Sequence, residues 1–576
     1  TGSGAVQLDS LNGQDLTKIT GTGAVAIRAG TAIAIDTDSL TVTLATVTNE
    51  AWTISGLTGS SDLVKAGLGT LVVSNAASFA GNVRVLQGKL MAVGALGSGS
   101  VTISNGVFAA YGAGTTLLNA YTVAGGTLLA DAGGSLGAGT ISLLAGGTLA
   151  ATNSGSLGAG SLFLTNATVR MDAGGSAGTR AISMVSGGLI QVYDGAGFDH
   201  ATLSLGGGAI DFRATTTVKC ALPLAANATV SATAPAVGTL AGAVTASGYK
   251  KLIVSGSGRV LMAGGGTFSG SGEIFVQGSG DLTIVSNEVV VTGYAGLESG
   301  GKRFAIADGG TFSMTGNGAN LHAGMGAGDC TFEVLTGGVF NVSAGVNLLV
   351  GNGGNTTLRI CGGTVNVANN GQFLLGNLST TTTGTVELAA GGVLKTSRQI
   401  KTGLGSGALL FTGGTLQSDG ANTYDPWVAT NIAVSVGSAG GMVDTRGLEM
   451  KLGSAGLAGA GTLSLTGGGS LLFAQPSTNW AGGLSLVQGT AVVSTNRALG
   501  VSAVSLGTNT LRVAANAFLP NAIDAAVSGG AVFVDAGATG LIASVSGGLL
   551  VKRGSGGLLM DDAAEGTDFS IQGGQL

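Results

Sequence analysis

The chain has 576 residues, of which 109 are glycine and only 5 proline, and its formal net charge is −5. Charged residues make up 9% and hydrophobic residues 44%, which excludes simple disorder because disorder requires the reverse balance. Glycine without a triplet period or abundant proline excludes collagen. The weak charge argues against nucleic acid as a partner. The chain contains no long apolar run free of glycine, so the sequence predicts no transmembrane helix.

An internal repeat with an offset of 21 residues is the first strong signal along the chain. Gly134–Leu143 reads GSLGAGTISL and Gly155–Leu164 reads GSLGAGSLFL, so their apolar positions align. Self-similarity at such a period is typical of a solenoid, in which each repeat forms one coil.

Gly-Gly pairs that precede short apolar segments are a second periodic signal. Val339–Val342 and Thr364–Val367 each follow such a pair and alternate with period two, which predicts short strands with alternate side chains inward. Gly and Asn supply the left-handed backbone that sharp corners need, and Asn355, Asn369 and Asn370 fit that role. The pairs begin at Gly125, Gly146, Gly187, Gly309, Gly337, Gly362, Gly391, Gly413, Gly529 and Gly547.

These patterns predict an all-β fold, a right-handed parallel β-helix that runs as a single continuous solenoid over residues 1–576. At about 22 residues per coil the chain makes roughly 26 coils, and a strand spacing of about 4.8 Å gives a rod on the order of 125 Å long. A β-sandwich is the alternative, but sandwiches usually contain more proline, more aromatics and longer connections.

Four segments, near residues 62–97, 250–282, 461–500 and 547–576, share a longer motif. The first copy reads DLVKAGLGTLVV from Asp62, followed by FAGNVRVLQGKL from Phe79 and ALG from Ala95. In the first copy the Lys is Lys65.

These copies resemble the passenger-associated β-strand repeat of bacterial autotransporter-like proteins. Val443–Arg446 and Ile35–Asp38 are similar to its usual lead-in, and Gly362–Val367 followed by Leu374–Asn377 resembles a variant found in large secreted bacterial repeat proteins. The resemblance implies a secreted β-helix displayed on the cell surface, commonly a stalk or an adhesive fibre. It implies no reaction.

One set of charged residues is a candidate active site, because many secreted β-helices degrade polysaccharides. Such sites need two or three carboxylates on one face with a cation nearby. Asp194, Asp199 and His200, with Asp211 and Arg213 about one coil later, are the best candidates. A solvated corner loop is the more economical interpretation of this set.

Other residues whose side chains could take part in catalysis or binding are interpreted as structural. The Asp561-Asp562 pair is expected in an exposed turn, and His322 at the surface or in a satisfied core position. The G-x-S-x-G string at Gly133–Gly137 signals a nucleophile only between a strand and a helix. The cysteines Cys220, Cys330 and Cys361 are expected to be small core residues. Trp52, Trp427 and Trp480 are expected to pack, the last in the same repeat position as Phe79.

The sequence thus favours a structural, extracellular or cell-surface rod or fibre subunit that assembles with copies of itself, laterally or head-to-tail. No enzymatic activity, catalytic residue, cofactor or metal is expected. Head-to-tail stacking is expected because no capping helix is evident at Thr1–Thr17 and Leu576 stops inside a repeat. An adhesin that binds a glycan or cell surface, for example through Ser418–Trp427, is one alternative. A polysaccharide-degrading enzyme is another.

Overall fold

The computed structural model describes residues 6–8, 24–27, 33–36, 42–46, 48–199, 201–298, 300, 302–326, 328–420, 425–453, 456–525, 527, 529–563 and 567–576. Within these residues the chain is a parallel β-solenoid of about 23 turns without helices. This confirms the predicted fold class, and the number of turns is close to the expected 26. No helix among the described residues has the length and apolar character needed to cross a membrane.

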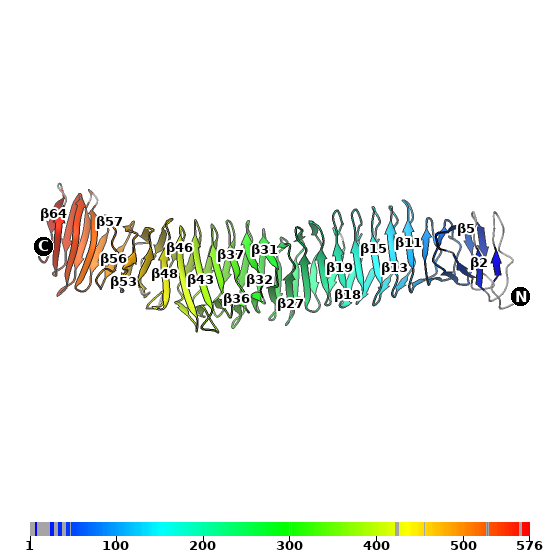
Figure 1. Cartoon of the computed structure of the whole chain (residues 1–576), viewed down its shortest axis with the longest axis horizontal. Coiled ribbons are helices and arrows are strands. Elements are labelled where there is room, and N and C mark those ends of the chain that lie inside the picture. Colours follow the sequence, from blue (N-terminus) through cyan, green and yellow to red (C-terminus); the bar gives the residue numbers. More distant parts are fainter. Residues whose placement is uncertain are drawn as a thin grey trace. The chain divides into compact units, whose positions relative to one another are not determined.

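The chain divides into two compact units, each of which is described by itself. Unit 1 comprises residues 1–246 and 250–264, and unit 2 comprises residues 247–249 and 265–576. In both units successive coils place strands side by side on the same faces, here called faces A, B and C (Figure 1).

Unit 1 is built mainly from coils with two strands, one on face A and one on face B. Face A contains β1 (Val6–Leu8), β2 (Ala24–Ile27), β4 (Val42–Ala45), β6 (Leu63–Ala66), β8 (Val83–Val85), β10 (Val101–Ile103), β12 (Tyr121–Val123), β14 (Ile141–Leu143), β16 (Ser161–Thr165), β18 (Ala181–Ser186), β20 (Thr202–Leu205), β23 (Leu222–Leu224) and β26 (Val244–Ser247). Face B contains β3 (Ile33–Asp36), β5 (Ala51–Thr58), β7 (Thr70–Val73), β9 (Lys89–Ala92), β11 (Val107–Tyr111), β13 (Thr127–Asp131), β15 (Thr148–Ala151), β17 (Thr168–Met171), β19 (Leu189–Val192), β21 (Ala209–Phe212), β24 (Ala228–Ala232) and β27 (Lys251–Ser255). Face C contains β22 (Thr216–Val218), β25 (Val237–Leu240) and β28 (Arg259–Met262).

Unit 2 begins with coils of three strands. Face A contains β29 (Gly266–Ser269), β32 (Glu288–Val291), β35 (Thr311–Met314), β38 (Val339–Val342), β41 (Thr364–Val367), β44 (Val393–Thr396), β47 (Thr415–Gln417), β49 (Gly441–Asp444), β52 (Leu463–Thr466), β55 (Leu484–Leu486), β57 (Val504–Gly507), β59 (Ala517–Ala525), β61 (Thr539–Gly547) and β63 (Gly557–Ala563). Face B contains β30 (Glu273–Gln277), β33 (Ala295–Glu298), β36 (Asn320–Met325), β39 (Asn347–Val350), β42 (Phe373–Leu375), β45 (Ile400–Thr402), β50 (Glu449–Leu452), β53 (Ser470–Phe473), β56 (Thr490–Val493), β58 (Thr510–Val513), β60 (Gly530–Val534), β62 (Leu549–Arg553) and β64 (Asp568–Ile571). Face C contains β31 (Asp281–Val285), β34 (Arg303–Ala307), β37 (Cys330–Val334), β40 (Thr356–Ile360), β43 (Thr383–Ala389), β46 (Ser406–Thr412), β48 (Ile432–Val436), β51 (Leu457–Gly459) and β54 (Asn479–Trp480).

The strand register follows the sequence repeat. In β14 and β16, Ile141 pairs with Leu162 and Leu143 with Leu164, which reproduces the predicted offset of 21 residues. The pairing is parallel, so residues at the same repeat position lie directly above one another. Among the predicted corner residues, Asn370 adopts a positive φ of 68°, whereas the prediction is wrong for Asn355 and Asn369, whose φ is not positive.

Inward-facing side chains form stacked columns because of this register. In unit 2, Phe304 and Phe332 stack with ring centroids 4.9 Å apart, and Phe312 stacks on Phe340 at 5.5 Å. All four rings are fully buried. Such aromatic pairs add about 0.5–1.5 kcal/mol each beyond the apolar area that they bury.

The predicted packing of the tryptophans is confirmed. Trp52, Trp427 and Trp480 are at most 2% exposed, as is Phe79 at the repeat position of Trp480. The Trp480 Nε1 donates a hydrogen bond to the Gly461 carbonyl at 3.0 Å. These rings therefore fill the core.

The lysine of the repeat motif is buried and binds carbonyl oxygens at a corner. The Lys65 Nζ donates to the carbonyls of Ala66 at 2.8 Å, Gly67 at 2.7 Å and Gln87 at 3.0 Å, the last one coil further on. The Lys552 Nζ makes the equivalent three contacts in the C-terminal copy. The K-x-G element therefore joins two coils through one ammonium group.

Asparagines join coils at the A-L-G corners of two motif copies. The Asn119 Nδ2 donates to the carbonyls of Gly97 at 3.2 Å and Gly99 at 2.6 Å. The Asn521 Nδ2 donates to the Leu499 carbonyl at 3.1 Å. Both asparagines are buried, so their donors replace water at turns that the main chain leaves unpaired.

Arg180 is completely buried and binds carbonyl oxygens from the two preceding coils of unit 1. Its guanidinium donates to the carbonyls of Leu157 at 2.7 Å, Gly139 at 2.7 Å and Gly137 at 2.8 Å. Burial lowers the pKa of this guanidinium to about 10, so it stays protonated at neutral pH. Arg398 in unit 2 is 1% exposed and binds carbonyls in the same manner.

The substitution Arg180→Met should destabilise the coils around β14, β16 and β18 by about 3 kcal/mol, because it leaves the buried carbonyl oxygens of Leu157 and Gly139 without a donor. Amide hydrogen exchange in these strands measures the loss. Arg84→Met is the control, since Arg84 is exposed on β8, and its effect should stay within about 0.5 kcal/mol. Equal protection in the two variants would contradict the anchoring role of Arg180.

Candidate functional site

The predicted carboxylate set separates into two ion pairs. The Asp211 Oδ2 lies 2.5 Å from the Arg213 Nε, and Asp199 lies 3.1 Å from the Lys219 Nζ. Asp194 is exposed in a turn, and His200 lies outside the described residues. Among the described residues no group of three His, Cys, Asp or Glu side chains has the arrangement of a metal site.

Five other charged residues on face C of unit 2 form a chain of ion pairs in which positive and negative side chains alternate. Arg303 contacts Asp281 at 3.0 Å and Glu333 at 2.6 Å, and Arg359 contacts Glu333 at 3.6 Å and Glu387 at 3.4 Å. The five side chains come from β31, β34, β37, β40 and β43, so every contact joins neighbouring coils. These charges stabilise the stack through their mutual attraction.

The serine of the G-x-S-x-G string belongs to a ladder of turns. The Ser135 Oγ accepts a hydrogen bond from the Gly137 amide at 3.2 Å, and Ser156 and Ser176 accept from the glycine two residues later in the same way. Ser135 forms a parallel bridge to Ser156. The string therefore marks a repeated corner.

His322 lies at one end of an amide ladder. Its Nδ1 is 2.5 Å from the Asn352 Nδ2, and the Asn352 Oδ1 accepts from the Asn377 Nδ2 at 2.9 Å. Because an amide nitrogen only donates, the His322 Nδ1 is the acceptor and the ring is neutral. Burial lowers the pKa of His322, which is consistent with this state. The ladder agrees with the expected satisfied position.

The three cysteines are free thiols. Cys220 and Cys330 are buried, as predicted, and burial raises the pKa of Cys220 to about 11. The prediction is wrong for Cys361, which is only partly buried because it follows the end of β40 at a corner.

Two further expectations concern exposed segments. Asp561 and Asp562 are exposed, as predicted, but they lie within β63, since this coil extends its strand past the expected turn. The segment Ser418–Trp427 includes residues 421–424, which lie outside the described residues, and Trp427 is fully buried. That tryptophan therefore offers no surface for a ligand.

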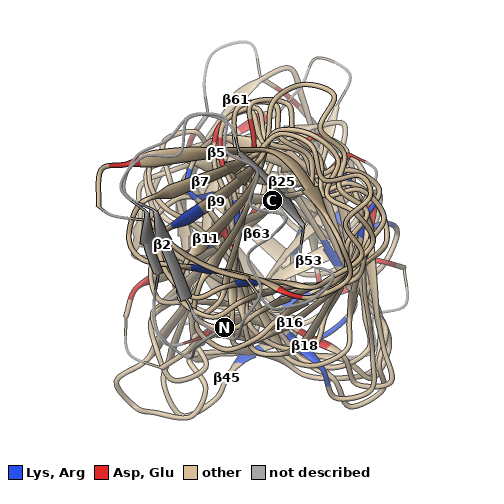
Figure 2. Ribbon diagram, turned by 90° about the vertical axis from the view of Figure 1, so that its right-hand side faces the viewer, with Lys and Arg blue, Asp and Glu red and all other residues tan. Residues whose placement is uncertain are grey.

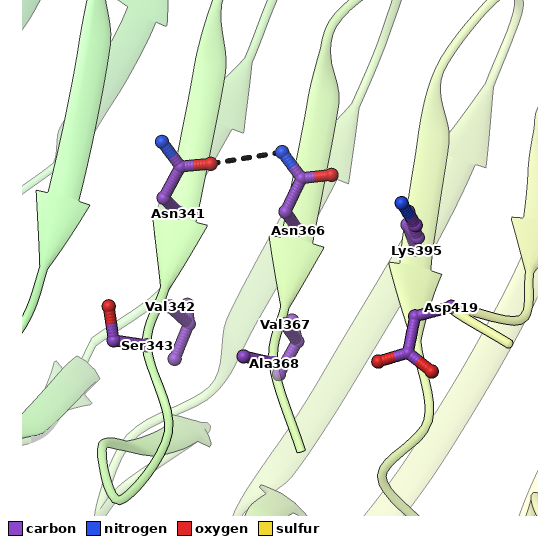
Figure 3. A pocket seen from close by; sticks show the side chains of 8 residues that line it. All are labelled: Asn341, Val342, Ser343, Asn366, Val367, Ala368, Lys395 and Asp419. Carbon is purple, nitrogen blue, oxygen red and sulfur yellow. Dashed lines mark hydrogen bonds between the residues drawn. The ribbon is translucent and has the colours of Figure 1, made fainter. Parts of the chain in front are cut away.

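A shallow hollow with a volume of about 390 Å³ lies over face A of unit 2, where the coils of β38, β41 and β44 meet (Figure 3). Two rows of side chains surround it. The first row contains Asn341, Asn366 and Lys395, and the second contains Ser343, Ala368 and Asp419. The sequence signal for this site is the Asn that recurs at the third position of VFNV and TVNV.

Charged residues are sparse around the coils, and most of the ribbon is uncharged (Figure 2). The candidate ligand site of this solenoid is the hollow over face A of unit 2, which polar and apolar residues line together. No protein-family model, curated protein or solved structure matches the chain.

The substitution Glu333→Gln should destabilise β34, β37 and β40 by about 1 kcal/mol, since Arg303 and Arg359 both lose their shared carboxylate. Hydrogen exchange at low salt measures the effect, and high salt should reduce it. Glu449→Gln is the control, because Glu449 is exposed and has no ion pair among the described residues. If Glu333→Gln destabilises these strands no more than Glu449→Gln does, the chain of ion pairs does not stabilise the stack.

Proposed function

We propose that this chain is a structural element of an extracellular or cell-surface protein, a β-solenoid scaffold that associates with copies of itself. The observation that carries the proposal is that polar side chains bond successive coils to one another. Buried cations, the charge chain on face C and the amide ladders all bond one coil to the next. Such an arrangement makes stability a sum of contacts between neighbouring coils, which suits a scaffold.

The repeat motif supports the extracellular assignment. Its lysine, in the two copies that contain one, makes the same three carbonyl contacts, so the motif has one physical role at two separate places. The resemblance of this motif to the passenger-associated repeat then suggests a secreted protein displayed on a cell surface.

Self-association is supported by the strand geometry and the low charge. Any parallel stack of coils presents unpaired strand edges at its two ends, and such edges pair with other chains unless they are covered. With 9% charged residues, little electrostatic repulsion opposes contact between copies.

Light scattering and electron microscopy of the full chain test the proposal. We expect the mass-average size to rise with protein concentration through the micromolar range, and fibres or bundles to be visible. A monodisperse monomer at every concentration, with single particles in the micrographs, would contradict self-association.

A further inference from the structure

The amide ladder beside the hollow on face A has a direction. The Asn366 Nδ2 donates to the Asn341 Oδ1 at 2.9 Å, and the Asn341 Nδ2 donates to the Ser313 Oγ at 3.2 Å. The Ser313 hydroxyl then donates to the Glu288 Oε1 at 2.6 Å. Every donor thus points toward the Glu288 carboxylate, and successive bonds in such a chain polarise one another.

The opposite end of this ladder is a free acceptor. No side chain in the described part of the chain donates to the Asn366 Oδ1, which Figure 3 shows on the side of Asn366 that faces the strand of Lys395. Lys395 on β44 is the register partner of Asn366 on β41, so it lies one coil further along the same outward-facing row. Lys395 is half-buried as a residue, and its ammonium makes no hydrogen bond or ion pair with the described residues.

The second row supplies the depth of the hollow and another acceptor. Ala368 contributes only a methyl group between Ser343 and Asp419, so the surface is recessed at this position. One oxygen of the Asp419 carboxylate accepts from the Ser397 hydroxyl at 2.8 Å, which holds the carboxylate at the edge of the hollow.

From these groups we infer a binding site for a polysaccharide whose sugar units carry adjacent hydroxyl groups. Two such hydroxyls donate to the Asn366 Oδ1 and the Asp419 carboxylate, and an oxygen of the same sugar accepts from the Lys395 ammonium. A vicinal diol offers two hydroxyl donors beside oxygen acceptors. That pattern is complementary to an ammonium group flanked by two acceptors. The hollow has the volume of a small-molecule site and is open, so a chain can cross it.

Affinity electrophoresis of the full chain in gels that contain dextran or polygalacturonate tests the site. Dextran is a neutral polymer and polygalacturonate carries carboxylates, so the two gels show whether Lys395 receives a hydroxyl or a carboxylate oxygen. We expect at least one polymer to retard the protein, and Lys395→Met and Asn366→Leu each to weaken binding by about tenfold.

Asn347→Leu is the matched control. The Asn347 Nδ2 donates to the Asn320 Oδ1 at 2.7 Å, so this variant removes the same kind of amide ladder from face B. Its binding should equal that of the parent chain. The site is refuted if neither polymer retards the parent, if both hollow variants bind like the parent, or if the control weakens binding equally. Hydrogen exchange verifies that the variants are folded, and either hollow variant suffices for the comparison.

Discussion

Main-chain hydrogen bonds between successive parallel strands determine which side chains lie above one another, and the other features of both units depend on that register. In unit 2 it stacks Phe304 on Phe332 and places the Asn341 and Asn366 amides within bonding distance. The same register aligns the charge chain on face C. A shift by one residue would exchange the core and surface rows, so the alternating burial of strands such as β13 and β24 protects the register.

Corners pose the opposite problem, because there the chain must turn and its carbonyl oxygens lack ladder partners. The chain meets this demand with long buried donors. Lys65 and Lys552 act at the K-x-G corners, whereas Arg180 bonds to turns of preceding coils. Glycine is required beside such a donor: at Gly88, where φ is +68°, an added Cβ would lie 2.8 Å from the Lys65 Nζ. Cations in the interior are therefore structural here.

The fold was predictable from the sequence because the repeat offset is itself the register, as β14 and β16 illustrate. The packing of Trp480 followed from its shared position with Phe79. The buried arginines were not predictable, because a single Arg180 or Arg398 leaves no periodic signal and its acceptors are main-chain carbonyls. The hollow over face A also needed the structure, since it combines the recurring Asn341 and Asn366 with residues from later coils.

Register is thus the central claim, and pairwise cysteine crosslinking on face B of unit 1 tests it most directly. Thr127 and Thr148 are register partners in β13 and β15, and Thr168 follows one coil later in β17. In a variant whose native cysteines are replaced by alanine, Thr127→Cys with Thr148→Cys should form a disulfide on mild oxidation, since adjacent strands are about 4.8 Å apart. Thr127→Cys with Thr168→Cys, about 10 Å apart, should not. Crosslinking of the second pair in preference to the first would contradict the account.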